Sequence, residues 1–408
     1  MSDEAEPREP LAKYRPEKQR QGIGLCLSGG GFRAALFHLG ALRRLNELGI
    51  LHQVQTISAV SGGSILSAHL ATSLAWPLPG PVPPEVWEGK VAAPFRAFTR
   101  RNLRTLPLVA RFVLPWRWFR SSAVVESIIQ RYRRRLRPLG RPLTELPATP
   151  RFIFCATDMA FGVNWIFERT RMGDYQAGYV SPPPADWTIA HAVGASACFP
   201  PLFNPLPVRI AAGLFKKGRF PRGKDRDEHL SDLRLTDGGN YDNMGLEPVW
   251  KDHEIVLVSD GGGLFSASRD RGFFRRLLRY AEISDNQARA VRKRWLIASF
   301  ADGSGKSLAG TYWGIGSARE SYELDGGYSK QDASQLIARI RTDLDSFSRA
   351  EIAVLENHGY QLADAAIAHH LPGLVAGSYP PLAPPHPEWL DADRMKKALR
   401  GSGRRKIL

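Results

Sequence analysis

Two strand–turn–helix units between Gly22 and Leu70 constrain the fold of this chain most strongly. In the first unit, an apolar run of strand length, Gly22–Leu27, is followed by the turn Ser28-Gly29-Gly30-Gly31 and then by apolar residues at helical spacing up to Leu48. Glycines before a helix expose backbone N–H groups at the positive end of that helix. This arrangement suits any anion, whether a phosphate or an oxyanion.

In the second unit, the apolar run Val54–Val60 ends at Ser61-Gly62-Gly63, and another apolar helix follows. A serine flanked by small residues at a strand-to-helix junction is typical of a nucleophile elbow, because the tight turn leaves no space for side chains beside the hydroxyl. Ala59 stands where the usual G-x-S-x-G pattern has its first glycine. The alternative role for Ser61 is a helix N-cap, which is common for serine at such a junction.

Strands and helices alternate along the rest of the chain. Strands are predicted at 151–156, 162–169, 233–237, 254–259 and 295–300, and helices at 188–197, 273–294 and, as a pair, 332–370. The alternation predicts an α/β fold, a three-layer α/β/α sandwich with a mostly parallel central sheet whose ligands meet the carboxyl ends of the strands. Two of these strands end in a carboxylate followed by glycines, at Asp237 and at Asp260.

Length and composition suggest one large domain. With 408 residues, of which 43% are apolar, the chain can bury a sizeable core. We expect residues 1–20 to be a charged flexible tail, residues 21–370 to form the α/β domain, and residues 371–408 to be a proline-rich and basic C-terminal segment. The three cysteines, Cys26, Cys155 and Cys198, have neither metal-ligand spacing nor a disulfide framework, so we expect no metal and a reducing, cytoplasmic compartment.

Residues 94–145 form a basic, aromatic segment that we interpret as a lid-like insertion. The whole chain has a net charge of +16, and between Arg96 and Arg141 only Glu126 opposes thirteen arginines. Aromatic side chains, including Trp116 and Trp118, lie among them. The segment could associate with an anionic membrane surface, or it could pack its aromatic residues on the core. A nucleic-acid partner is not expected, because no nucleic-acid module accompanies the charge.

Two glycine-rich stretches resemble nucleotide-binding motifs, but neither fits. Gly29–Ala34 matches G-x-G-x-x-A, yet the second strand ends in Ser61 where a dinucleotide site has an acidic residue. Gly303–Ser307 resembles part of a P-loop, but Phe300 occupies the place of its first glycine. We therefore expect no cofactor.

Four motifs in this order resemble the patatin-like phospholipase family. They are Ser28-Gly29-Gly30-Gly31-Phe32-Arg33, Ser61 within Ala59–Gly63, Ala195-Ser196-Ala197-Cys198-Phe199-Pro200 and Asp237-Gly238-Gly239. The resemblance spans about Gly22 to Leu264. It implies a Ser–Asp dyad that hydrolyses acyl esters of lipids.

The resemblance implies a role for each matching residue: Ser61 as nucleophile, Asp237 as base, the amides of Gly30 and Gly31 as oxyanion donors, and Gly29, Arg33, Gly63, Gly238 and Gly239 as supporting residues. Two residues depart from the family pattern, Ala59 in the elbow and Ala34 where the first motif usually closes with glycine. Neither departure removes a reactive group.

The chemistry places a condition on Asp237. An aspartate with an ordinary pKa near ~3.9 is a weak base at neutral pH, so Asp237 must be buried close to the Ser61 hydroxyl. Asp260 is the alternative base. His358 follows Ser61 and Asp237 in the order of a Ser…Asp…His hydrolase, so a triad is a further alternative.

The sequence thus predicts a lipid acyl hydrolase, a phospholipase A-type or related carboxylic ester hydrolase, acting through an acyl-Ser61 intermediate in the cytoplasm or at a membrane periphery. Two alternatives share these features. One is a basic, membrane-associating patatin-like effector that is inactive until activated. The other is an acyltransferase that uses the same acyl-enzyme.

Overall fold

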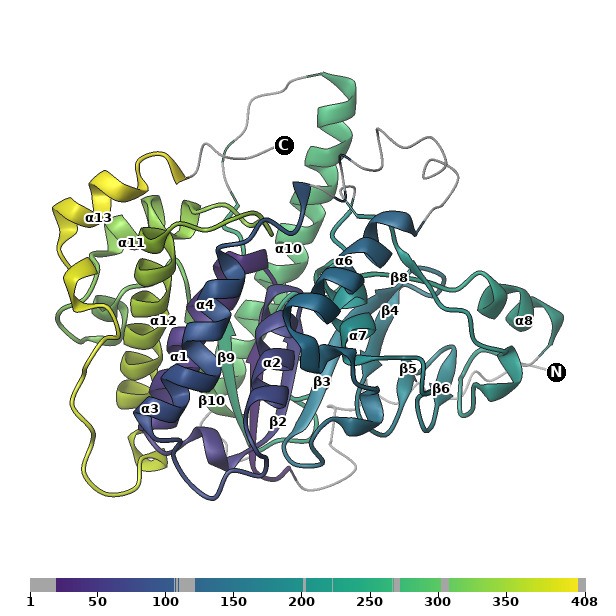
Figure 1. The fold of residues 1–408 in the computed structure, drawn as a ribbon, viewed down its shortest axis with the longest axis horizontal. Helices are drawn as coiled ribbons and strands as arrows, with labels where there is room; N and C mark the ends of the chain where they lie inside the picture. Colours follow the sequence, from purple (N-terminus) through teal and green to yellow (C-terminus); the bar gives the residue numbers. More distant parts are fainter. Residues whose placement is uncertain are drawn as a thin grey trace, which may run out of the picture.

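A central β-sheet between layers of helices forms the body of the molecule, seen in the computed structural model in Figure 1. The structure describes residues 20–105, 107, 109, 122–200, 203–221, 223–265, 267, 272–301 and 308–402. The expected flexible tail lies outside the described residues except for residue 20.

The sheet has a parallel centre and antiparallel edges. The strands are β1 (Ile23–Leu27), β2 (Val54–Val60), β3 (Arg151–Asp158), β4 (Val163–Phe167), β5 (Met172–Asp174), β6 (Gly178–Val180), β7 (Leu206–Pro207), β8 (Arg234–Asp237), β9 (Ile255–Asp260) and β10 (Ala309–Gly314). Their order is β10-β9-β1-β2-β3-β4-β5-β6, and β8 pairs with both β3 and β7. The first five strands in this order are parallel, which confirms the predicted α/β fold with a mostly parallel central sheet.

The helices cover both faces of the sheet. The α-helices are α1 (Gly31–Glu47), α2 (Gly62–Ser73), α3 (Pro84–Trp87), α4 (Ala93–Thr99), α6 (Ala123–Arg135), α7 (Ile189–Ser196), α8 (Lys224–Ser231), α9 (Gly239–Asp242), α10 (Phe273–Ala301), α11 (Lys330–Gln335), α12 (Arg349–His370) and α13 (Ala392–Leu399). In Figure 1, α1, α2 and α12 lie in front of the sheet and α10 lies behind it.

The central strands are buried on both sides, which explains their continuous apolar runs. Leu25 and Leu27 of β1 belong to the large core under α1, α2 and α12. Cys26 points to the other face, into a smaller core that includes Val249 and Leu296 of α10. Both faces of β1 are therefore filled.

One predicted strand is wrong. Residues 295–300, which we expected as a strand, are the last turns of α10, and the strand that pairs with β9 is β10. A short apolar run has the same composition in a buried strand and in a helix. The preceding helical pattern continues through it without a glycine or a proline.

The described part of the basic, aromatic segment packs on the core. Phe95 and Phe98 of α4 are buried, and Phe98 makes edge contacts with Phe32 and lies near Tyr132 of α6. Much of the segment, including Trp116 and Trp118, lies outside the described residues. Membrane association of residues 94–141 stays a prediction.

The C-terminal segment packs against the domain. The carbonyls of Pro380 and Pro381 accept hydrogen bonds from the buried guanidinium of Arg44, at 2.7 and 3.1 Å. Met395 and Leu399 of α13 are buried. Within the described part of the chain, no helix is both long enough and apolar enough to cross a membrane.

Candidate active site

The two turns singled out in the sequence are in backbone contact. β1 and β2 are parallel neighbours, with Leu27 opposite Ala59, so the turns leave the same edge of the sheet. The amide of Gly63 donates to the carbonyl of Ser28 at 3.2 Å. A Cβ on Gly62 would lie 2.0 Å from the carbonyl oxygen of Gly31, so only glycine allows this approach. The elbow and the glycine turn therefore form one rigid unit.

Ser61 has the strained backbone of an elbow. Its φ of 51° and ψ of −115° lie outside the regions that L-residues normally adopt, and a strained residue of this kind persists only when its surroundings hold it. Its side chain caps no amide of α2, which argues against the N-cap alternative. The side chain is 8% exposed and lines a pocket.

Ser196 of α7 holds the elbow in place. Its Oγ accepts a hydrogen bond from the amide of Ser61 at 2.9 Å and donates to the carbonyl of Cys155 at 2.5 Å. The hydroxyl of Ser64 lies 2.8 Å from the same oxygen. Ser196 belongs to one of the predicted motifs, but its role could not be predicted, because its hydrogen bond to Ser61 joins residues 135 positions apart.

Asp237 ends β8, which runs antiparallel to β3, and it lines the same pocket as Ser61. It is 3% exposed, as the chemistry required. Its Oδ1 accepts the amide of Gly239 at 2.8 Å, while its buried Oδ2 lacks a hydrogen bond of standard geometry from any described residue. This oxygen is available to take a proton.

Burial raises the pKa of Asp237 to about 6. The amide of Gly239, the Ser61 hydroxyl and the charge of Arg289 act in the opposite direction, and the charge of Asp285 adds to the increase. The carboxylate is thus a better base than an exposed aspartate, and it is still mostly ionised at neutral pH.

The two glycines after Asp237 meet close neighbours. A Cβ on Gly238 would lie 2.4 Å from the carbonyl oxygen of Cys155, and one on Gly239 would lie 2.8 Å from Oδ1 of Asn243. Both glycines let the Asp237 turn approach β3 and the segment that carries Asn243.

Gly30 and Gly31, the expected oxyanion donors, lie at the start of α1. Both residues have positive φ, 140° and 58°, which glycine adopts without strain. Gly31 begins α1, and neither amide donates to any group within the described residues. Both residues line the pocket with Ser61, at the positive end of a helix of 17 residues.

Arg33 is a structural residue. Its guanidinium is buried and donates to the carbonyls of Gly261, Ala338 and Ile340 at 2.8–3.2 Å. Burial lowers the pKa of this group to about 10. It does not line the pocket, so its contribution is to tie the turn after β9 and the segment before α12 to α1.

The departure at Ala34 is compensated by another glycine. A Cβ on Gly261 would lie 2.6 Å from Cα of Ala34. The turn after β9 can therefore approach α1 closely because Gly261, rather than residue 34, lacks a side chain.

The alternative base and the alternative triad both lie elsewhere. Asp260 accepts hydrogen bonds from the Tyr312 hydroxyl and the Gly262 amide, each at 2.8 Å, and does not line the pocket. His358 lies within α12, where its Nε2 is 2.9 Å from the carbonyl of Ile315. Burial lowers its pKa to about 4. It is a core histidine.

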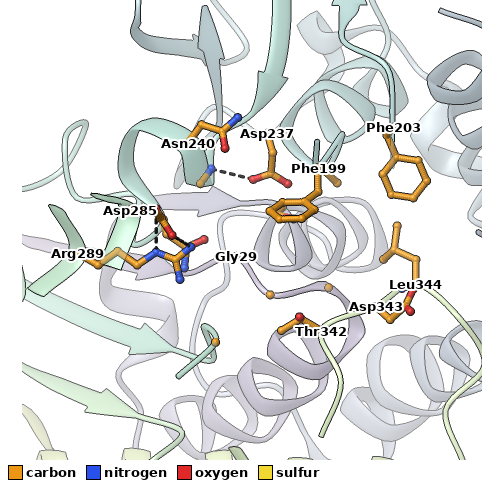
Figure 2. Close-up of a pocket in the computed structure, with 17 residues that line it drawn as sticks. Gly29, Phe199, Phe203, Asp237, Asn240, Asp285, Arg289, Thr342, Asp343 and Leu344 are labelled. Atoms are coloured by element: carbon orange, nitrogen blue, oxygen red, sulfur yellow. Dashed lines mark hydrogen bonds and ion pairs between the residues drawn. The ribbon is translucent and has the colours of Figure 1, made fainter. Parts of the chain in front are cut away.

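The pocket has a volume of about 190 Å³ and two chemically different ends. Figure 2 shows Asp285 and Arg289 of α10 at one end, joined by an ion pair of 2.7 Å, and Phe203 and Leu344 at the other, next to Asp343, which pairs with Arg104. Asp237 and Phe199 lie side by side between the two ends.

Two walls of the pocket, α10 and residues 342–344, could not be predicted from the sequence. In the second wall, the carbonyl of Asp343 accepts a hydrogen bond from the amide of Phe32, and the carbonyl of Leu344 accepts one from the amide of Leu103, both at 2.9 Å. Asp343 also pairs with Arg104. Such contacts join distant parts of the chain and leave no local pattern. Within the described residues, no group of three or more histidine, cysteine and acidic side chains could hold a metal ion.

Comparison with solved structures finds proteins of low identity. Two structures of human GIVD cytosolic phospholipase A2 match at 14% identity, with TM-scores of 0.39 and 0.48, over 60% and 87% of this chain. The chain covers 46% and 59% of those two chains, about half of their length. VipD from Legionella pneumophila matches at 13% identity with a TM-score of 0.34, covering 86% of this chain and 67% of that one.

A search of curated proteins found no match. The family comparison gives a clear result, because the model of the patatin-like phospholipase family matches residues 25–250, a little over half of the chain. This match includes Ser61 and Asp237 and both turns of the pocket. The chain belongs to the patatin-like phospholipase family.

Proposed function

We propose that this protein is a lipid acyl hydrolase, a phospholipase A-type or related carboxylic ester hydrolase, with Ser61 as nucleophile and Asp237 as base. The observation that carries the proposal is the buried Oδ2 of Asp237, which accepts no hydrogen bond of standard geometry from the described residues, in the pocket that the strained Ser61 also lines. A carboxylate with a pKa of about 6 beside a serine hydroxyl supports a dyad.

Acylation would begin with attack of Ser61 Oγ on the ester carbonyl, while the hydroxyl proton passes to Oδ2 of Asp237. The carbonyl oxygen becomes an oxyanion, which the amides of Gly30 and Gly31 stabilise. When the tetrahedral intermediate collapses, the ester C–O bond breaks and the alcohol leaves with the proton from Asp237. An acyl-Ser61 ester remains.

Deacylation would use the same groups with water as the nucleophile. Asp237 takes a proton from water, the hydroxide attacks the acyl carbonyl, and the oxyanion again lies at Gly30 and Gly31. Collapse then breaks the bond to Ser61 Oγ, which recovers its proton from Asp237, and the carboxylic acid is released. A base that returns to its ionised state after each half-reaction needs no cofactor.

The two ends of the pocket favour an amphipathic ester. Phe199, Phe203 and Leu344 offer apolar contact to an acyl chain, whereas Asp285 and Arg289 offer charged contact to the polar part. This polarity and the family membership together support lipid esters over small polar ones.

We also propose that residues 21–370 form the hydrolase domain, that residues 94–145 are an insertion in it, and that the enzyme works in the cytoplasm or at a membrane periphery. The burial of Met395 and Leu399 supports treating residues 371–408 as a segment attached to this domain.

The test is release of fatty acid from phosphatidylglycerol vesicles and from a soluble short-chain ester. We expect Ser61→Ala to abolish both activities and Asp237→Asn to reduce both by roughly 1000-fold, within the range for loss of a general base. Ser73→Ala, at the other end of α2, is the matched control and should keep parent activity. Full activity of Ser61→Ala would contradict the proposal.

A further inference from the structure

Helix α10 carries a stripe of exposed apolar side chains. Six apolar residues on one side of the helix form it in two groups, each residue between 41% and 67% exposed: Phe273, Leu277, Tyr280 and Ile283, and two turns later Val291 and Trp295. Ser284, Gln287 and Ala288 occupy the same side between the two groups. Soluble domains rarely expose this many large apolar side chains on one helix, and where they do, the surface is usually a binding surface.

Basic residues flank the stripe. α10 contains seven arginines and lysines against two acidic residues, Glu282 and Asp285. At 100° per residue, Arg276, Arg279 and Arg294 fall on or beside the side of the helix that carries the stripe, whereas Arg275 and Lys293 fall on the opposite side. The helix therefore combines an apolar face with a cationic border.

A third side of α10 holds it to the domain. Leu296 is buried in the smaller core, and Arg292 donates to the carbonyl of Tyr241. Asp285 and Arg289, on the same side, line the pocket. The stripe is thus directed away from the domain, although Trp295 at its C-terminal end also packs edge-on against Trp250 at 4.9 Å between ring centres.

The N-terminal part of α10 extends past the domain. In Figure 1 one end of this helix rises above the other layers. Leu278 lies on the same side of the helix as Leu296, yet it is 50% exposed, so this part of α10 is not covered by the domain. Leu264 and Phe265, which follow the pocket residue Gly263, are exposed as well. The Arg279 guanidinium of α10 lies over the Phe265 ring, 4.0 Å from its centre, so the segment at the pocket rim contacts α10.

We propose that α10, together with Leu264 and Phe265, docks the enzyme on the surface of an anionic lipid bilayer. A helix with an apolar face and a basic border lies in the interface, with apolar side chains among the acyl chains and basic side chains near the phosphates. Charge complementarity selects this partner: a cationic border would repel a second copy of this basic face, and it is attracted to an anionic bilayer.

Docking in this manner would place the pocket beside the bilayer. Asp285 and Arg289 line the pocket from the inner side of α10, and the two apolar groups lie on the outer side of the same helix, one before and one after these residues. The distance from bilayer to pocket would be about one helix diameter, roughly 10 Å. α10 lies outside the residues matched by the family, so this surface belongs to the remainder of the chain.

Vesicle flotation tests the proposal with Ser61→Ala as the starting protein, so that binding is measured without turnover and independently of the proposed hydrolase chemistry. We expect binding to vesicles of phosphatidylcholine that contain about 30 mol% of the anionic lipid phosphatidylglycerol. Leu277→Ser combined with Ile283→Ser should weaken binding by roughly tenfold or more. Arg276→Gln combined with Arg294→Gln should weaken it by at least about fivefold, and only with anionic vesicles.

The matched control is Leu214→Ser combined with Leu382→Ser, two exposed leucines that lie far from α10 in the sequence. This variant should bind as tightly as its parent. Failure of the parent to float would overturn the proposal, as would binding that responds to the control and not to the α10 variants. Lipid-free dimers that the α10 substitutions dissociate, without vesicle binding, would assign the face to a second copy and equally overturn it.

Discussion

The pocket and the outer side of α10 lie on either side of Asp285 and Arg289, and they place their side chains in opposite environments. In the pocket, Ser61 and Asp237 are buried and their backbones are fixed by neighbouring turns. On α10, large apolar side chains are exposed to solvent. Burial gives the carboxylate its raised pKa, and exposure leaves the helix free to bind a surface.

Stability and function are coupled differently in these two regions. A buried aspartate that must ionise costs folding free energy, so the pocket is a place where function lowers stability. Exposed apolar side chains on α10 bury little on folding, so they can be replaced at little cost. Substitutions in the pocket should therefore change both activity and stability, whereas substitutions on the outer side of α10 should leave stability nearly unchanged.

The largest effect is expected for Asp237→Asn, which should lower activity and raise stability. Activity should fall by roughly 1000-fold because the base is lost. The pKa of Asp237 is raised to about 6 in the folded protein, above its value in the unfolded chain. Between about pH 4 and pH 6 the unfolded chain has therefore lost this proton while the folded protein still holds it, and the free energy of unfolding falls as the pH rises. Asparagine avoids this cost, and the variant should be more stable above pH 6 by up to about 3 kcal/mol.

Denaturant unfolding at pH 8 and at pH 4 measures this gain, which should disappear at the lower pH. Leu277→Ser on α10 is the comparison and should change the free energy of unfolding by less than about 0.5 kcal/mol at either pH. An Asp237→Asn variant that is less stable than the parent at pH 8 would show that the buried carboxylate does not carry the predicted cost.

The next effect is steric, at the contact between the two turns. Gly62→Ala would place a Cβ 2.0 Å from the carbonyl oxygen of Gly31, which is backbone and cannot rotate away. The glycine turn must move, so the oxyanion donors are displaced and activity should fall by roughly 100- to 1000-fold. Gly89→Ala is the control, because no atom lies within 4 Å of its added Cβ. Parent-like activity of Gly62→Ala would disprove the rigid contact.

The pH profile should report the ionisation of Asp237. Because the base must be deprotonated, kcat/KM for a soluble ester should rise about tenfold per pH unit at low pH and level off above about pH 6. Initial rates across pH 4.5 to 8, a range that is roughly centred on this pKa, give the midpoint. A midpoint near the ordinary aspartate value of ~3.9 would mean that Asp237 is not desolvated.

The smallest effect comes from the ion pair of α10 at the rim of the pocket. Arg289 lowers and Asp285 raises the pKa of Asp237. Arg289→Gln should therefore move the midpoint of the pH profile upward, and Asp285→Asn should move it downward. The two variants are matched, since each removes one charge from one pair of the same helix. Shifts in the same direction would contradict an electrostatic cause.

The parallel centre of the sheet and both turns could be predicted from the sequence, because their signals are local. β1 and β2 are apolar runs buried on both faces, and each leads through small residues into a helix. The burial of Asp237 could be predicted from chemistry, because an exposed aspartate would be too weak a base. Its assignment over Asp260 rested on the family motif.

Other features could not be predicted, because they depend on contacts between distant residues. Residues 295–300 have a composition that suits a strand or a helix, and only their packing as the end of α10 decides between them. Ser196 supports Ser61 from 135 positions away, and Asp343 reaches the start of α1 from beyond position 300. Arg33 is predicted as a supporting residue of the first motif, but the three distant carbonyls to which it donates leave no pattern in the sequence.

The most direct test of the dyad is labelling with a fluorophosphonate probe, followed by intact mass and peptide mapping. We expect one adduct per chain, located on Ser61, in the parent and in Ser73→Ala. We expect no adduct in Ser61→Ala and strongly slowed labelling in Asp237→Asn, with both variants folded by circular dichroism. An adduct on another serine, or labelling of Asp237→Asn at the rate of the parent, would contradict the assignment of Ser61 and Asp237.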